Sequence, residues 1–62
     1  TPESQVIFAE LLAARGENDA ARDMLEGMLL EVSGGPKFFR RQSARWVRQA
    51  KRMLAKLPRR TS

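Results

Sequence analysis

Apolar residues recur at helical spacing in three segments of the chain, and no segment has the strict alternation of a half-buried strand. The first segment carries Ile7, Phe8, Leu11, Leu12 and Ala14. The second carries Ala21, Met24, Leu25, Met28, Leu29 and Val32. The third carries Phe39, Ser43, Val47, Ala50, Leu54 and Leu57, with Trp46 and Met53 beside them. This pattern predicts an all-α fold.

The ends of the first two helices are marked by residues that favour helix termini. Thr1 can cap the first helix, with Pro2 at its first position. Gly16 follows the first apolar segment, and glycine accepts the left-handed conformation in which many helices end. Asn18 can then cap the second helix. We therefore expect a tight αα-hairpin.

The strongest turn signal is the run Ser33-Gly34-Gly35-Pro36, and Pro58 ends the apolar pattern that follows it. Between them we expect one continuous helix, longer than the other two. The chain is expected to form a single small domain, residues 1–62, with helices at about 2–15, 18–32 and 37–57 and a tail at 58–62.

The first two helices resemble the helical hairpin of the tetratricopeptide repeat over about residues 5–33. The positions that match the repeat pattern are Phe8, Ala9, Leu12, Gly16, Ala21 and Leu25. Gln5 replaces the Trp of that pattern and Ser33 replaces its Pro, and the third helix matches only loosely. The resemblance implies a scaffold that binds peptides or helices without catalysis, with the third helix as a cap. The hairpin, with its Gly turn followed by Ala-Arg-x-x-Leu, is also similar to one found in bacterial multi-protein assembly factors. That similarity and the Ala- and Arg-rich composition favour a bacterial origin.

Small residues in the hairpin predict close contact between its two helices. Ala9 and Ala21 allow the helix axes to approach, and Gly27 is a further candidate for close approach. Phe8, Leu12 and Leu25 are expected to fill the remaining space.

Composition argues against catalysis. The chain has no Cys and no His, which removes disulfides, thiolate or imidazole metal sites and the usual nucleophile–base pairs. Asp19, Asp23 and Glu26 share one helix flank, and a solvated flank balanced by arginines is favoured there over a cation site. We predict no enzyme activity and no catalytic, cofactor-binding or metal-binding residues.

Charge divides the chain in two. Residues 1–36 hold seven acids and two arginines, a net charge of −5, whereas residues 37–62 hold ten Lys or Arg and no acid. Such a split indicates an anionic partner or an internal contact between the acidic and basic parts. Because Arg41, Arg45, Arg48 and Arg52 recur at helical spacing, they predict a basic stripe along the third helix.

The preferred contact site is an exposed Phe38 together with this stripe, since aromatic residues beside Arg are enriched at interface anchors. We predict a protein–protein interaction module whose partner is a protein or peptide, with an acidic one preferred. The alternatives are a basic nucleic-acid-binding domain and a self-associating domain, and the stripe could also simply balance the acidic hairpin. A chain of 62 residues buries a small core, which favours association or a place in a longer protein.

No apolar run approaches the roughly 20 residues of a membrane span. We therefore expect a soluble domain, in the cytoplasm rather than outside the cell.

Overall fold

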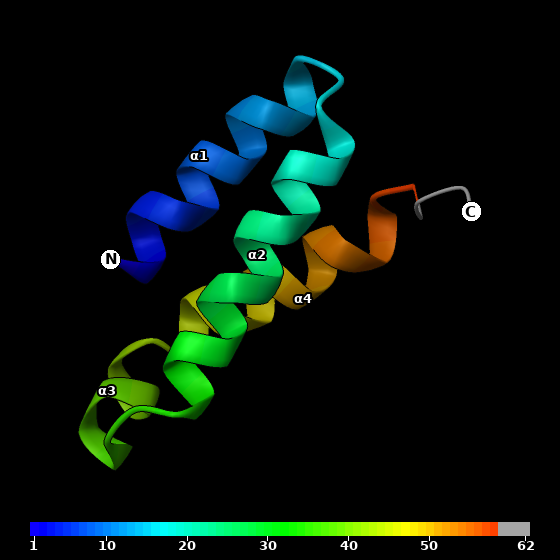
Figure 1. Ribbon diagram of the computed structural model, residues 1–62. Coiled ribbons are helices and arrows are strands. Elements are labelled where there is room, and N and C mark those ends of the chain that lie inside the picture. Colours follow the sequence, from blue (N-terminus) through cyan, green and yellow to red (C-terminus); the bar gives the residue numbers. More distant parts are fainter. Residues whose placement is uncertain (59–62) are drawn as a thin grey trace.

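The computed structural model describes residues 1–58 and contains four helices and no strand in that range. The helices are α1 (Pro2–Ala14), α2 (Asn18–Ser33), α3 (Lys37–Gln42) and α4 (Ala44–Lys56), shown in Figure 1. The predicted all-α class is confirmed, while the last four residues of the predicted tail lie outside the described residues. None of the four helices combines the length and the apolar character that crossing a bilayer requires.

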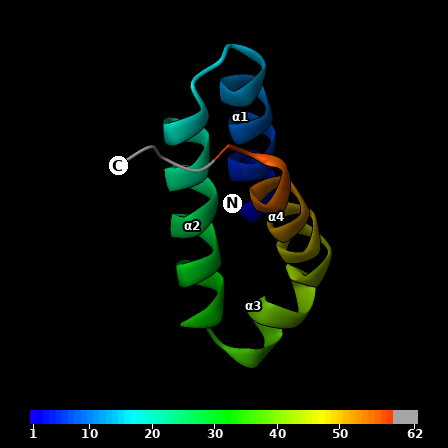
Figure 2. The same ribbon diagram turned by 90° about the vertical axis from the view of Figure 1, so that its right-hand side faces the viewer.

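Helices α1 and α2 form an antiparallel hairpin joined by a short turn (Figures 1 and 2). The Thr1 hydroxyl oxygen accepts a hydrogen bond from the Ser4 N–H, which caps α1 as predicted. At the other end Gly16 has φ +82°. Its N–H donates to the Ala13 carbonyl oxygen, and the Glu17 N–H donates to that of Leu12, so α1 ends in a Schellman motif.

The start of α2 differs from the prediction. Asn18 is the first helical residue and Glu17 occupies the cap position, where no side chain bonds to the backbone. Asn18 as a cap is therefore wrong, because the Schellman turn already places Glu17 at the junction.

Helix α4 crosses the hairpin and packs against both α1 and α2. Helix α3 lies at the end of the molecule away from the α1–α2 turn and leads the chain from α2 into α4 (Figure 2). The core where the three longer helices meet contains Val6, Ala9, Ala21, Leu25, Met28, Val32 and Ala50. Three of these seven residues are alanines with no exposed surface, so small side chains make part of the contact between the helices.

The predicted inner faces hold for α2 and for the third segment, but not for α1. Ile7, Phe8 and Leu11 are 54%, 49% and 54% exposed, and Val6 and Ala9 face the core instead. The prediction that Phe8 fills space inside the hairpin is therefore wrong. Apolar residues lie nearly all round α1, so periodicity could not choose between its faces, and the smaller side chains allow closer packing.

The predicted third helix is divided at Ser43, which corrects the expectation of one long helix. Ser43 is buried and has φ −93° and ψ 0°, outside the usual helical range. Its N–H still donates to the Phe39 carbonyl oxygen, and its own carbonyl accepts from the Val47 N–H. Hydrogen bonding therefore continues through a bend, which no Pro or Gly in the sequence marks.

The glycines also correct a prediction. A Cβ atom on Gly27 would meet nothing within 4 Å, so Gly27 is not a point of close approach. At Gly35 a Cβ would lie 2.7 Å from the Phe39 ring. A side chain at position 35 would therefore have to displace the Phe39 ring, which packs against the core.

Candidate binding groove

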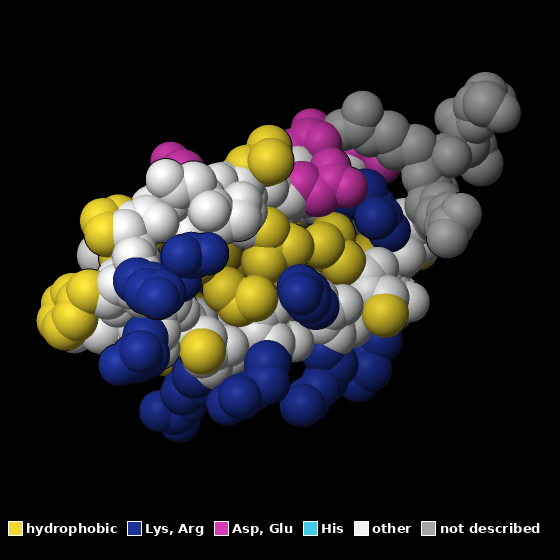
Figure 3. Space-filling view, turned by 90° about the horizontal axis from the view of Figure 1, so that it is seen from below, with side chains coloured by type: hydrophobic (Ala, Val, Ile, Leu, Met, Phe, Trp, Pro, Cys, Tyr) yellow, Lys and Arg dark blue, Asp and Glu magenta, His cyan; other side chains and the backbone are white. Residues whose placement is uncertain are grey.

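A groove of about 770 Å³ lies between the C-terminal half of α2 and the α3–α4 segment. Its walls are formed by Glu26, Leu29, Leu30, Val32, Ser33, Arg40, Ala44, Val47, Arg48 and Lys51. Figure 3 shows a face of the molecule on which hydrophobic side chains gather between Lys and Arg side chains.

Two helical ladders form the long walls of the groove. On α2 four of the five lining residues lie at positions 26, 29, 30 and 33, with Val32 beside them, and on α4 the lining residues lie at 44, 47, 48 and 51. Both sets follow the i, i+3, i+4, i+7 spacing that places side chains on one face of a helix. The groove therefore runs along two helices, and its shape follows directly from their packing.

The floor of the groove is apolar. Leu29 and Val47 are partly buried and pack against the core, while Leu30 is 74% exposed. Because Leu29, Leu30 and Val47 line the same groove, they form a shared apolar surface, and contiguous apolar surface is a feature of protein-binding sites.

The edges of the groove are mainly positive. Arg40, Arg48 and Lys51 line it, against the single carboxylate of Glu26. Glu26 has a partner of its own, since its Oε2 lies 3.9 Å from Arg22 Nη1. A ligand in the groove therefore meets three cations whose charge Glu26 offsets only in part.

The five predicted contact residues do not all belong to this groove. All five are exposed, Phe38 at 71%. Of the four arginines only Arg48 lines the groove, and the guanidinium of Arg45 lies 5.5 Å from the centre of the Trp46 ring. The remaining ones, Arg41 and Arg52, are exposed without lining the groove. The predicted stripe and the groove thus share one residue.

Sequence reasoning missed the apolar part of the groove. Leu30 lies beside the buried stripe of α2 rather than in it. An apolar residue outside that stripe was the one sign in the sequence of an exposed apolar surface. The opposite wall comes from α4, and nothing in the local pattern predicts which residues of two helices face each other.

If the basic stripe only balances the acidic hairpin, ion pairs between the two are expected. Within residues 1–58, one ion pair joins Arg15 to Glu17 at 3.5 Å and another joins Arg22 to Glu26 at 3.9 Å. Both cations belong to the hairpin itself. Asp19 and Asp23 of the hairpin make interactions of their own, so the balancing role of the stripe stays a prediction.

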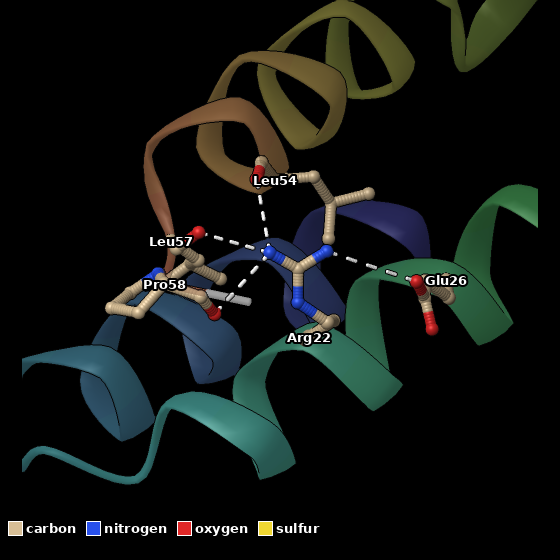
Figure 4. Close-up of polar contacts among 5 residues, drawn as sticks. All are labelled: Arg22, Glu26, Leu54, Leu57 and Pro58. Carbon is tan, nitrogen blue, oxygen red and sulfur yellow. Dashed lines mark hydrogen bonds and ion pairs between the residues drawn. The ribbon is translucent and has the colours of Figure 1, made fainter. Parts of the chain in front are cut away.

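Arg22 makes a contact between helices that sequence reasoning did not predict. Its Nη2 donates to the carbonyl oxygens of Leu54 at 3.3 Å, Leu57 at 2.9 Å and Pro58 at 3.4 Å (Figure 4). Leu54 lies in the last turn of α4, and Leu57 and Pro58 directly follow the helix, where carbonyl groups lack helical partners. Arg22 therefore fastens the C-terminal end of α4 to α2.

The acidic flank of α2 forms no metal site in the part of the chain that is described. There, no group of three or more Asp or Glu side chains is arranged to hold a metal ion.

No protein-family model matches the chain, and no curated protein or solved structure shows detectable similarity to it.

Proposed function

We propose that this chain is a non-catalytic protein-interaction module that holds an amphipathic, acidic segment of a partner protein in the groove between α2 and α4. The observation that carries the proposal is the apolar floor of the groove, which lies between α2 and α4 and is bordered by Arg40, Arg48 and Lys51. The likeness of the hairpin to a tetratricopeptide repeat agrees with a scaffold role, since repeats of that kind present helical surfaces to peptides.

The shape and chemistry of the groove favour a helical ligand. Two walls with i, i+3, i+4, i+7 spacing can accept the apolar face of a partner helix, which is a common mode of peptide recognition. Leu30 and Val47 would contact the apolar side chains of that helix. Carboxylates along its edges would meet the three cations, which adds selectivity and speeds association.

Binding of a fluorescein-labelled amphipathic peptide, followed by anisotropy, tests the proposal. The peptide carries Leu on one face and Glu at its flanks, and a control peptide replaces each Glu with Lys. We expect the acidic peptide to bind and the basic peptide to bind at least about tenfold more weakly, because like charges at an interface are strongly unfavourable.

Matched variants locate the binding surface. Lys51→Glu and Leu30→Gln should both weaken binding of the acidic peptide, because both residues line the groove. Arg52→Glu makes the same charge change as Lys51→Glu on the same helix, but outside the groove. If Arg52→Glu weakens binding as much as Lys51→Glu, the groove is not the binding site.

A second candidate function is supported by the exposed arginines of α3 and α4, which follow one another without any acidic residue. Such a surface can contact nucleic-acid phosphates, and binding would then fall steeply as salt rises. Titration with a random-sequence duplex at two salt concentrations separates the two functions. Salt-steep binding that is lost in Arg45→Glu and Arg52→Glu would favour nucleic acid, and no binding at low salt would eliminate it.

A further inference from the structure

Helix α1 has an outer apolar face that the rest of the described chain leaves uncovered. Its inner face supplies Val6 and Ala9 to the core. Its outer face presents Ile7, Phe8 and Leu11, each about half exposed. This face is separate from the groove, whose lining comes from α2, α3 and α4. A helix that is apolar on both sides is typical of a helix buried between two neighbours.

The outer face of α1 is bordered by opposite charges. Residues at positions 3, 7, 11 and 15 are spaced by four and lie along one ridge of the helix. From the N-terminal end this ridge reads Glu3, Ile7, Leu11 and Arg15, that is, acid, apolar, apolar, base. Read in the opposite direction it is base, apolar, apolar, acid, so the ridge is complementary to its own antiparallel copy.

We propose that two copies of this chain associate through the outer faces of α1, antiparallel and about a two-fold axis. In this arrangement Ile7 of each copy lies opposite Leu11 of the other. Glu3 of each copy lies opposite Arg15 of the other, so an ion pair closes both ends of the interface. A two-fold interface uses the same surface on both copies, and the ridge meets that requirement.

The present contact of Arg15 is compatible with this pairing. Its Nε lies 3.5 Å from Glu17 Oε2 in a pair whose side chains are 68% and 50% exposed. The guanidinium has further N–H groups to offer a second carboxylate. The interface rests on three half-exposed apolar side chains from each copy, so we expect a weak, concentration-dependent dimer.

Sedimentation equilibrium of the full chain over a wide concentration range tests the proposal. We expect a reversible monomer–dimer equilibrium, and Leu11→Gln should raise the dimer dissociation constant at least about tenfold. Leu30→Gln removes a comparably exposed leucine from another surface and should leave that constant unchanged. A monomer at all concentrations, or equal effects of the two variants, would overturn the proposal.

Charge exchange tests the antiparallel register. Glu3→Arg and Arg15→Glu should each weaken self-association, because each places like charges opposite each other. An equimolar mixture of these two variants should associate, since every end of the mixed dimer then pairs an acid with a base. No recovery in the mixture would refute this register, and melting curves of each variant control for loss of folding.

The same experiments identify other occupants of the face. If α1 instead docks in the basic groove of a second copy, Lys51→Glu should weaken self-association as much as Leu11→Gln does, and the mixture should not recover. That outcome would overturn the two-fold dimer. Peptide binding to the groove, measured with Leu11→Gln, reports on the proposed function separately, because Leu11 does not line the groove.

Discussion

The contact between Arg22 and the end of α4 gives the most direct test of what holds this fold together. The side chain of Arg22 is 17% exposed, and its guanidinium donates to three carbonyl oxygens that lie 32 to 36 residues further along the chain. Arg22→Met keeps most of the aliphatic stem and removes every hydrogen bond. The substitution therefore isolates the polar contact from the packing of the side chain.

The expected loss of stability follows from the geometry. A hydrogen bond from a charged donor contributes about 1.5–3 kcal/mol net. Only the bond to Leu57, at 2.9 Å, is short, while those to Leu54 and Pro58 are 3.3 and 3.4 Å. The Arg22 Nε is also buried with no hydrogen-bond partner within the described residues, which reduces the benefit of the side chain. We therefore expect Arg22→Met to lower the free energy of unfolding by about 1–2 kcal/mol.

A loss of that size is easily measured in so small a chain. Typical stabilities of about 0.05–0.15 kcal/mol per residue give a total of about 3–9 kcal/mol for this length. Each kcal/mol lowers the melting temperature by about 4–8 °C in domains of this size. Urea and thermal unfolding, followed by the helical circular dichroism signal, measure both quantities.

Glu26→Gln is the control for this measurement. Glu26 reaches Arg22 only at 3.9 Å and is half exposed, so its replacement should change the free energy of unfolding by less than about 0.5 kcal/mol. If Arg22→Met unfolds with the stability of the wild type, or Glu26→Gln is equally destabilising, the carbonyl contacts are not what fastens α4.

Two glycines and one core residue give further predictions, all measurable by urea unfolding. Gly27→Ala should raise stability by about 1 kcal/mol, because Gly27 lies inside α2 and an added Cβ meets nothing within 4 Å; a loss of stability would contradict the open space around it. Gly16→Ala should lower stability by about 1–2 kcal/mol, since φ is +82° there; an unchanged value would mean that the turn can rearrange. Leu25→Ala should cost about 2–5 kcal/mol, because Leu25 is fully buried; a smaller loss would show that the core collapses around the missing side chain.

The parts of the fold that the sequence predicted are those where one helix face is clearly polar. The stripe from Ala21 to Val32 is such a case, and its buried residues lie where the spacing placed them. In α1 the run from Val6 to Ala9 is continuously apolar, so spacing alone carries no information about the direction of the helix face. The bend at Ser43 depends on how α3 and α4 pack on α2, and no helix-breaking residue marks it.

The candidate site was predictable only where it depends on local sequence. Phe38 and the arginines were expected at the surface and are found there. The groove itself joins α2 to α4, and Arg22 bonds to residues more than 30 positions away. Contacts of that kind arise from the relative placement of the helices, which periodicity within each helix does not determine.

The alanines at the centre of the molecule have a thermodynamic consequence. Ala9, Ala21 and Ala50 occupy positions where the helices meet, while bulkier side chains such as Ile7, Phe8 and Leu30 lie at the periphery. The faces that they form exist only in the folded chain, so any molecule that covers them binds the folded state and not the unfolded one. At a ligand concentration of 100 times its dissociation constant this linkage adds about 2.7 kcal/mol to the stability of the fold. The melting temperature of this chain should therefore rise with the concentration of whatever occupies those faces.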